Sequence, residues 1–268
     1  MATRKRFNPK PKKSGLARPP AIAIEAAVAH SGVMVPHSFA PLLFAGQHFH
    51  ALADDALYWP RHKALLVADL HLEKASWYAK SGQMLPPYDS QATLERLGRL
   101  IDDYDVEHVY SLGDNYHDSA GEARLDAAAG QMLRALTARV DWHWITGNHD
   151  EQLDGCWGGN VVAQSAVDGL LLCHEPDPAR MIPQICGHFH PKFRIQNRGR
   201  LVSRRCYMMS DSLLIMPAFG ALTGGLDASD AVYGDVFGAE GYQAVVPVNG
   251  KALSFPPECR SVKAKAVS

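Results

Sequence analysis

Five short polar motifs follow one another along the middle of this 268-residue chain, and each comes directly after an apolar run. Apolar runs of this length are typical of buried strands, and open α/β sheets bind ligands at the carboxyl ends of their strands. The motifs are, in chain order, Asp69-Leu70-His71, Gly113-Asp114-Asn115-Tyr116-His117-Asp118, Gly147-Asn148-His149-Asp150, Cys173-His174-Glu175-Pro176 and Gly187-His188-Phe189-His190-Pro191. The fold must therefore bring several strand ends together at one place.

Helical spacing of apolar residues between the motifs predicts a helix over residues 90–104 and another over 121–138. Asp89 or Ser90 would cap the first helix. The second helix would bury Ala127, Met132, Leu133 and Leu136. Strand–helix–strand alternation over residues 63–146 is typical of a parallel or mixed sheet.

Short strands separated by turns are expected elsewhere in the chain. They would lie within residues 42–59 and at Val161–Val167, Leu170–Cys173, Ile185–Cys186, Cys206–Met209, Leu213–Met216 and Tyr242–Val248. An α/β front half followed by a strand-rich back half predicts two mixed β-sheets packed together, with helices on the outside.

Charge is unevenly distributed along the chain. Residues 1–20 hold seven Lys or Arg, several prolines and no acidic residue, which predicts a disordered basic tail, and residues 21–268 are expected to form a single domain. Whether the tail contacts nucleic acid or is only solvated stays open. The rest of the chain is acidic, so attraction of phosphate would have to come from bound metals and local basic patches.

The cellular compartment is predicted from two further features. The five cysteines are scattered and form no CxxC pair, and three of them, Cys173, Cys186 and Cys206, lie in apolar strand-like runs, which fits buried thiols in a reducing compartment. No apolar run reaches the roughly 18 residues that span a bilayer, and no secretory signal is evident. We therefore expect a cytoplasmic protein that does not use a membrane as partner.

The motifs offer nitrogen and oxygen donors for metal ions. Residues two apart on an extended chain point to the same side, so Asp69 and His71 could grip one ion together, and so could His188 and His190. Asp114 follows a glycine that leaves room for close approach, which makes it the candidate to bridge two cations. The remaining candidate ligands are Asn148 and His174. This mixed set suits Mn²⁺, iron or Zn²⁺ better than Ca²⁺.

Two divalent ions held by two carboxylates would form a positive cluster that attracts phosphate and acidifies water. Metals about 3.5–4 Å apart can hold a bridging hydroxide for in-line attack on phosphorus. His149 directly follows a candidate ligand, so we expect it to contact the phosphate, stabilise the transition state and protonate the leaving group. His117, Asp118 and Asp150 are expected either as hydrogen-bond partners behind the ligands or as direct participants.

Other polar and aromatic residues near the motifs receive weaker interpretations. For the basic side chains a solvated surface is favoured over phosphate binding; they are Lys74, Lys192, Arg194 and Arg198. Base stacking and core packing both stay open for Trp77, Tyr78 and Tyr88. No functional role is assigned to His30, His37, His48, His50, His62, His108 or His143.

The motif order DxH, GDxxHD, GNHD, H and GHxH resembles the calcineurin-like metallophosphoesterases. Within them, the chain resembles the bacterial ligase-associated DNA damage response endonucleases, over about residues 40–250. The narrower resemblance lies in Leu72-Glu73-Lys74, Leu85-Pro86-Pro87-Tyr88, Ser111-Leu112-Gly113-Asp114, His174-Glu175-Pro176, and Pro217-Ala218-Phe219-Gly220 leading to Thr223-Gly224-Gly225. Asn115-Tyr116 departs from the family's usual residues after the bridging aspartate and is expected to alter the pocket wall.

The resemblance implies a four-layer αββα architecture with a dinuclear site, most readily filled by two Mn²⁺ ions. One metal would be held by Asp69, His71, Asp114 and His190. The other would be held by Asp114, Asn148, His174 and His188. Asp114 and His149 are the expected catalytic residues.

These interpretations predict a metal-dependent phosphodiesterase that acts as a DNA endonuclease in repair. Its partner would be single-stranded or damaged DNA, and the resemblance also implies association with a DNA ligase and a helicase. Two other hypotheses stay open: a small-molecule phosphodiesterase or pyrophosphatase acting on nucleotides, and a non-catalytic scaffold. A wide, open groove with basic rims favours DNA, whereas a lidded pocket favours metabolites.

Overall fold

The structure is a computed structural model that describes residues 39–177, 179, 181–197 and 200–257. The predicted tail over residues 1–20 lies outside the described residues, and the single domain over 21–268 stays a prediction.

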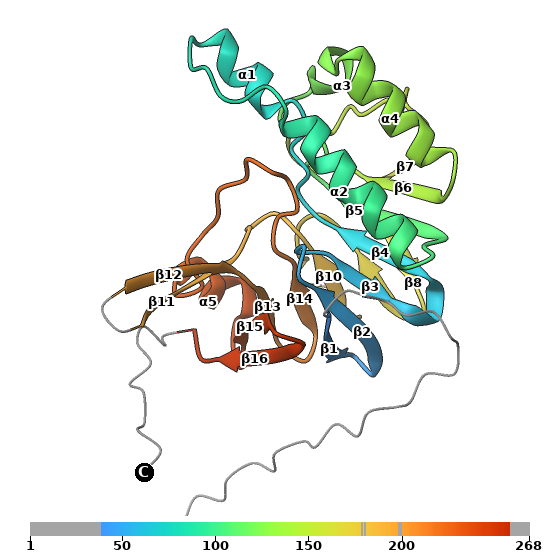
Figure 1. Cartoon of the computed structure of the whole chain (residues 1–268). Helices are drawn as coiled ribbons and strands as arrows, with labels where there is room; N and C mark the ends of the chain where they lie inside the picture. The colour runs from blue at the N-terminus through green and yellow to red at the C-terminus, as the bar shows by residue number, and fades with distance from the viewer. Residues whose placement is uncertain (1–38, 178, 180, 198–199, 258–268) are drawn as a thin grey trace, which may run out of the picture. The chain divides into compact units, whose positions relative to one another are not determined.

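Two seven-stranded sheets dominate the described residues (Figure 1). The first sheet has the order β1 (Phe39–Phe44), β2 (Gln47–Leu52), β3 (Leu57–Trp59), β4 (Ala64–Val67), β5 (His108–Leu112), β6 (Asp141–Ile145) and β7 (Asn160–Val162). Neighbours from β1 to β4 are antiparallel, and neighbours from β4 to β7 are parallel. The polar motifs after β4, β5 and β6 therefore all lie at one edge of this sheet.

The second sheet is also mixed. Its order is β16 (Lys251–Phe255), β15 (Gln243–Val248), β13 (Tyr207–Met209), β14 (Leu213–Ile215), β10 (Gln184–Cys186), β9 (Leu170–Leu172) and β8 (Ser165–Val167). Strand β10 runs parallel to β9 and β14, and the other neighbours are antiparallel. A separate hairpin consists of β11 (Lys192–Asn197) and β12 (Arg200–Arg205).

Helices flank the sheets in the order α1 (Lys74–Lys80), α2 (Asp89–Asp103), α3 (Gly121–Arg124), α4 (Ala127–Thr137) and α5 (Ala231–Phe237), with a short 3₁₀ turn at Pro60–His62.

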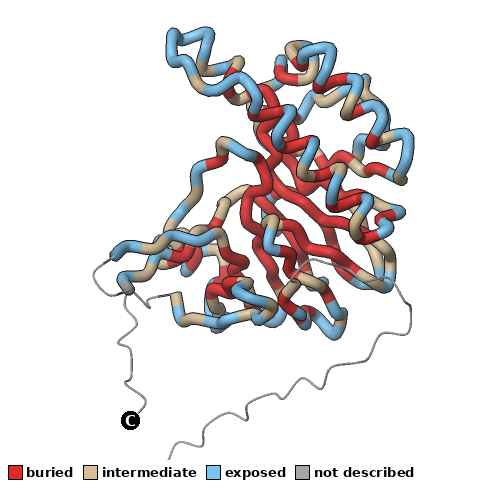
Figure 2. Tube along the Cα trace, viewed as in Figure 1, coloured by how far each residue is buried: buried red, intermediate tan, exposed pale blue. Residues whose placement is uncertain are grey.

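Three hydrophobic clusters separate four layers. The first joins α2 and α4 to the first sheet, for example through Leu97 and Trp142. The second fills the space between the sheets, where Leu66 and Leu214 belong to the same cluster, and the third places Tyr233 of α5 against the second sheet. Figure 2 shows the inner strands as a continuous buried region. The predicted pair of packed mixed sheets with flanking helices is therefore confirmed.

The predicted helix over 121–138 is wrong, because the chain breaks between α3 and α4. Asp126 is extended, and its carboxylate accepts the amide N–H groups of Ala128 at 2.8 Å and Ala129 at 3.0 Å. This N-cap starts a new helix. Ala127, predicted to face inward, is exposed as a result.

The residues predicted to cap α2 instead support α1. The Asp89 carboxylate accepts the N–H of Ala75 at 3.0 Å, and the Ser90 hydroxyl accepts the N–H of Glu73 at 2.9 Å. Free N–H groups in the first turn of α1 are thus satisfied from another helix. Helices α1 and α5 were not predicted, since each is only seven residues long.

The predicted single strand Val161–Val167 is also wrong. It divides into β7 of the first sheet and β8 of the second, so this segment carries the chain from one sheet to the other. The β11–β12 hairpin and β16 were not predicted.

The predicted burial of three cysteines is confirmed, since Cys173, Cys186 and Cys206 are buried thiols, while Cys156 is exposed. Among the helices of the described residues, none has both the length and the apolar character needed to cross a membrane.

Candidate metal centre

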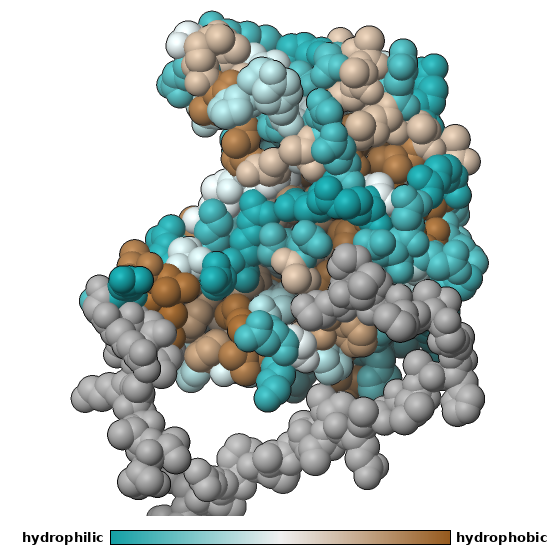
Figure 3. All heavy atoms as spheres, in the orientation of Figure 1, coloured by the Kyte–Doolittle hydropathy of each residue, from teal (hydrophilic) through white to brown (hydrophobic). Residues whose placement is uncertain are grey.

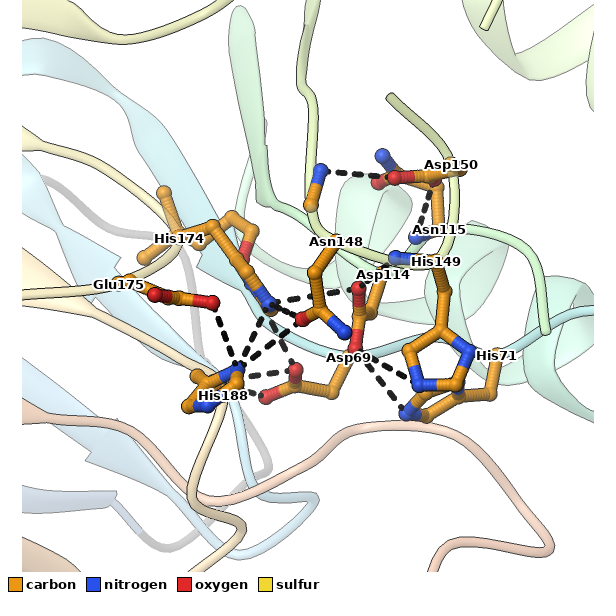
Figure 4. A network of polar contacts seen from close by, with 12 residues as sticks. Asp69, His71, Asp114, Asn115, Asn148, His149, Asp150, His174, Glu175 and His188 are labelled. Atoms are coloured by element: carbon orange, nitrogen blue, oxygen red, sulfur yellow. Dashed lines mark hydrogen bonds and ion pairs between the residues drawn. The ribbon is translucent and has the colours of Figure 1, made fainter. Parts of the chain in front are cut away.

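The candidate ligands converge where strand ends of both sheets meet (Figure 4). Asp69 and Asp114 follow β4 and β5 of the first sheet, whereas His174 and His188 follow β9 and β10 of the second. The two sheets are joined here by backbone and side chain, because the N–H of His188 donates to both carboxylate oxygens of Asp69 at 3.1 Å.

A first group of donors comprises Asp69, His71, Asp114 and His190, whose donor atoms lie within 4.8 Å of one another. The Nε2 atoms of His71 and His190 are 3.3 Å apart. Nε2 of His190 is 3.2 Å from Oδ1 of Asp69, and Nε2 of His71 is 3.7 Å from Oδ2 of Asp114. These are the same four residues that the family resemblance implies for one metal.

A second group shares Asp114 but uses its other oxygen. Nε2 of His174 is 3.3 Å from Oδ1 of Asp114 and 3.1 Å from Nδ1 of His188. Oδ1 of Asn148 lies 3.0 Å from the His174 nitrogen and 3.2 Å from the His188 nitrogen. Asp114 therefore presents one carboxylate oxygen to each group.

The donor chemistry of both groups fits divalent cations. Metal–ligand bonds of about 2.0–2.2 Å place neighbouring donors roughly 3.0–3.5 Å apart, which is close to the spacing found here. Nδ1 of His174 faces the carbonyl oxygen of Leu112 at 3.0 Å, so this nitrogen carries the proton and Nε2 keeps its lone pair. In both groups the lone pairs of imidazole nitrogens and carboxylate oxygens face one another. A cation between them would remove this repulsion.

Burial favours the ligand form of the histidines. Burial, followed by the neighbouring His190, lowers the pKa of His71 to about 2. Burial and the nearby His174 likewise lower the pKa of His188. Neutral imidazoles are the form that binds metal ions.

Strained backbone positions these ligands. Positive φ values occur at Asp69 (53°), His71 (43°), Asp114 (47°), His188 (74°) and His190 (48°). Such conformations are uncommon for residues other than glycine and cost of order 1–3 kcal/mol each. The expected reason for the two-residue spacing is therefore wrong: the paired ligands approach each other through left-handed turns and not along an extended strand.

Glycines before the ligands allow the close approach that the sequence indicated. A Cβ at Gly113 would collide with the imidazole of His174, and φ at Gly113 is +79°. A Cβ at Gly147 would collide with Asp114. Both positions therefore require glycine for the ligands to meet.

His149 lies beside the two donor groups that contain Asp114, and it forms a further cluster with His71 and His117, whose donor atoms also lie within 4.8 Å of one another. Its N–H donates to Oδ1 of Asp114 at 3.0 Å, and its Nδ1 lies 2.7 Å from the carbonyl oxygen of His117. A carbonyl only accepts, so Nδ1 carries a proton and Nε2 is the free nitrogen. This nitrogen lies 3.9 Å from Oδ2 of Asp114, on a side chain that is 38% exposed. It can thus reach a bound molecule from solvent.

Asp150 and His117 support the loops behind the donors. The Asp150 carboxylate accepts the N–H groups of Gly147 at 2.7 Å, Asn115 at 2.7 Å and Tyr116 at 3.2 Å. Burial raises the pKa of this carboxyl group, and the amide hydrogen bonds oppose that shift. The ring of His117 stacks on His149 with 5.5 Å between centroids. Burial and the charge of Lys74 lower the pKa of His117 to about 4.

Asp118 is not brought into the donor groups. Its carboxylate pairs with the guanidinium of Arg124, at 2.9 Å and 2.5 Å. This contact fastens the second motif to α3.

Asn115 has a role that the sequence interpretation missed. Its side chain is fully buried, bonds to the Ser111 hydroxyl and donates to the carbonyl oxygen of Ile145 at 2.9 Å. It therefore connects the ends of β5 and β6, and Tyr116 is buried as well, so neither forms the expected pocket wall. The polar Ser111 inside an apolar strand was the signal for this contact.

Comparisons with known proteins identify the family of this chain. Residues 62–218 match the family model for the calcineurin-like phosphoesterases. The chain is similar to the nuclease MPE of Pseudomonas putida, with 30% identity and a TM-score of 0.64, over 81% of this chain and 100% of that one.

Two other solved structures are similar at 16% identity and a TM-score of 0.35. One is AQ665 of Aquifex aeolicus, a protein of unknown function, matched over 47% of this chain and 78% of that one. The other is the Escherichia coli phosphoesterase Yfce, matched over 61% of this chain and 83% of that one. No curated protein matches the sequence.

The matched region contains every polar motif that the two sheets bring together, from Asp69 to His190. The chain belongs to the calcineurin-like phosphoesterase family, and its chemistry is the hydrolysis of phosphoesters.

Proposed function

We propose that this protein is a metal-dependent phosphodiesterase that cleaves DNA internally. The observation that carries the proposal is Asp114, whose two carboxylate oxygens face two adjacent groups of histidine, aspartate and asparagine donors. A bridging carboxylate between two metal positions is the arrangement that in-line phosphoryl chemistry uses. The similarity to a nuclease of Pseudomonas putida directs the proposal to nucleic acid.

Asp69, His71, Asp114 and His190 would hold one cation, and Asp114, Asn148, His174 and His188 the other. Such cations supply Lewis acidity toward phosphate and lower the pKa of coordinated water. Oxygen and imidazole donors in this ratio favour Mn²⁺, with iron or Zn²⁺ as alternatives.

His149 would act on the scissile phosphate. Its Nδ1 proton points to the His117 carbonyl, so only Nε2 can exchange a proton with the substrate. When doubly protonated, the ring donates from Nε2 to a phosphate oxygen or to the departing oxygen. The ring stacked on it holds this orientation.

Aromatic side chains beside His117 support a nucleic-acid substrate. The ring of Trp77 on α1 lies 4.9 Å from the His117 ring and 4.9 Å from that of Tyr78. The side chain of Trp77 is exposed. Exposed rings next to a phosphate site can stack unpaired bases. Figure 3 shows the described part of the molecule hollowed between α1 and the β11–β12 hairpin.

The biological setting of the proposal is DNA repair, with a DNA ligase and a helicase as partners. The repair setting and both partners are inferred from the narrower sequence resemblance alone.

The first test is cleavage of circular single-stranded DNA by the Mn²⁺-loaded protein, with Asp114→Ala as control. Duplex plasmid and bis-p-nitrophenyl phosphate would be tested in parallel. A circle has no ends, so its cleavage by the wild type and not by the control supports an endonuclease. Hydrolysis of the small ester with an intact circle would overturn the DNA proposal in favour of a small phosphodiester substrate.

A further inference from the structure

A second cluster of donors lies at the opposite ends of two strands that lead to the metal centre. His108 is the first residue of β5, and it pairs in register with Asp141, the first residue of β6. His143 lies two residues further along β6, on the same face as Asp141. Farther along, this face presents Tyr110 and Ile145 to the core between the sheets. The three polar residues therefore occupy the rim of that core.

The donor atoms of the cluster already point at one another. Oδ2 of Asp141 is 3.4 Å from Nδ1 of His108 and 3.1 Å from Nε2 of His143. The three donor atoms lie within 4.8 Å of one another. These separations match those between neighbouring donors around a cation with bonds of about 2.0–2.2 Å.

Neighbouring side chains hold the donors in place. The amide of Asn160 on β7 donates to the other carboxylate oxygen of Asp141 at 3.2 Å. The ring of Tyr110 lies parallel to that of His143, with 4.7 Å between centroids. Supporting contacts of this kind orient the ligands of metal sites.

His108 provides a separate indication of a missing ligand. Its Nδ1 atom is buried and forms no hydrogen bond with a described residue, because the contact with Oδ2 of Asp141 at 3.4 Å is an ion-pair distance only. A buried nitrogen without a hydrogen-bond partner is unfavourable, and a cation would satisfy its lone pair. The side chain as a whole is 38% exposed, that of Asp141 is 48% exposed and that of His143 is 20% exposed, so an ion can enter from solvent.

We propose that Nδ1 of His108, Oδ2 of Asp141 and Nε2 of His143 bind one divalent transition-metal ion of the Zn²⁺ type. Two imidazoles select against Mg²⁺ and Ca²⁺, which prefer oxygen ligands. The fourth position faces solvent and would be filled by water. The site is independent of the proposed function, because it lies at the amino ends of strands whose carboxyl ends carry Asp114 and Asn148.

Such an ion would connect β5 to β6. These strands position the bridging aspartate and the candidate asparagine ligand at their far ends. The site is therefore a structural cross-link beneath the catalytic groups. It would make the protein more resistant to unfolding when Zn²⁺ is present, because a ligand that binds only the folded state stabilises it.

The test measures Zn²⁺ bound per chain by mass spectrometry of metals after dialysis. It compares the wild-type protein with His143→Gln, with His108→Gln and with the matched control His48→Gln, which removes an exposed histidine of β2. The proposal expects one equivalent less in each of the first two variants and no loss in the control. Asn160→Ala should keep the site but bind about 10–100-fold more weakly.

A second readout separates this site from the metal centre. Zn²⁺ should still raise the melting temperature of Asp114→Ala, and adding His143→Gln to that variant should abolish the shift. Mn²⁺-dependent hydrolysis should be unchanged in His143→Gln, and its circular dichroism should match the wild type. Equal Zn²⁺ content in the wild type and both cluster variants would overturn the proposal and leave an ordinary histidine–aspartate ion pair.

Discussion

Strands β5 and β6 carry histidine and aspartate at both ends, but the two ends are built differently. At the carboxyl ends the carboxylates of Asp114 and Asp150 are buried, with a side-chain exposure of 4% for Asp114, whereas Asn148 is exposed. At the amino ends Asp141 is about half exposed, and His108 and Asp141 simply begin regular strands.

The backbone is strained at the carboxyl ends and regular at the amino ends. Asp114 has a positive φ, and the preceding Gly113 avoids a collision with His174. His108, Asp141 and His143 have no positive φ. Strain and burial at one end are costs that only a strong opposing interaction can offset. We therefore propose tight, activity-linked cation binding at the carboxyl ends and weaker, dispensable binding at the amino ends.

The largest expected effect separates the aspartates of the two ends. Asp114→Ala should lower kcat/KM by more than about 10³-fold, because it removes a carboxylate shared by both donor groups. Asp141→Ala should leave the Mn²⁺-dependent rate near that of the wild type. Hydrolysis of bis-p-nitrophenyl phosphate measures both. A comparable loss in the two variants would contradict the division of roles between the ends.

His149→Ala should lower kcat by about 10²–10⁴-fold, the usual contribution of a proton donor at the reacting group. Bound Mn²⁺ should stay near the wild-type value, because His149 belongs to neither of the two donor groups that contain Asp114. Steady-state kinetics and metal analysis on the same sample test this, with His143→Ala as the control at the other end. Loss of metal from His149→Ala would instead make it a ligand.

Supporting residues at the two ends should also differ in their contribution to stability. Asp150→Ala leaves the N–H groups of Gly147, Asn115 and Tyr116 without their acceptor, and unsatisfied buried donors cost about 1–3 kcal/mol each. We expect the free energy of unfolding to fall by about 2–4 kcal/mol, after partial relaxation. Asn160 is exposed and supports Asp141 through a single hydrogen bond. Asn160→Ala should therefore change the free energy of unfolding by no more than about 0.5 kcal/mol.

Urea unfolding of the metal-free proteins gives both values. An equal decrease in the free energy of unfolding in Asp150→Ala and Asn160→Ala would contradict this prediction. It would mean that the Asp150 hydrogen bonds stabilise the protein no more than the Asn160 hydrogen bond does.

The order of polar motifs after apolar runs was sufficient to predict where the candidate site assembles. Strand ends of a parallel sheet meet at one edge, and this needs no knowledge of side-chain geometry. The predicted extended conformation of Asp69 and His71 was wrong because tertiary backbone bonds decide it. The N–H of Asp69 donates to Gly113 at 3.2 Å, and that of His71 donates to Asp114 at 2.9 Å. Contacts 40 or more residues away leave no local pattern.

Some predicted boundaries of strands and helices were wrong for the same physical reason. The residues of Val161–Val167 suit a strand throughout, and only the presence of a second sheet decides that β7 and β8 separate. Asp89 and Ser90 have the chemistry of N-caps, but their partners are amides of α1. His108 and His143 received no role from the sequence, since the pairing of β5 with β6 is what places them beside Asp141.

The smallest expected effect is a pH dependence that belongs to the carboxyl ends. The pKa of His117 is about 4 in the folded chain and near its ordinary value of 6.5 when unfolded, because burial and Lys74 disfavour the charged ring. Below pH 6.5 the unfolded state therefore binds more protons, so the free energy of unfolding of the metal-free protein should decrease as the pH falls from about 6.5 to about 4. His117→Gln should make this decrease shallower, whereas His143→Gln provides the amino-end comparison. Urea unfolding across this pH range after metal removal measures the slopes, and an unchanged slope in His117→Gln would show that His117 contributes no pH-dependent stability at this end of the strands.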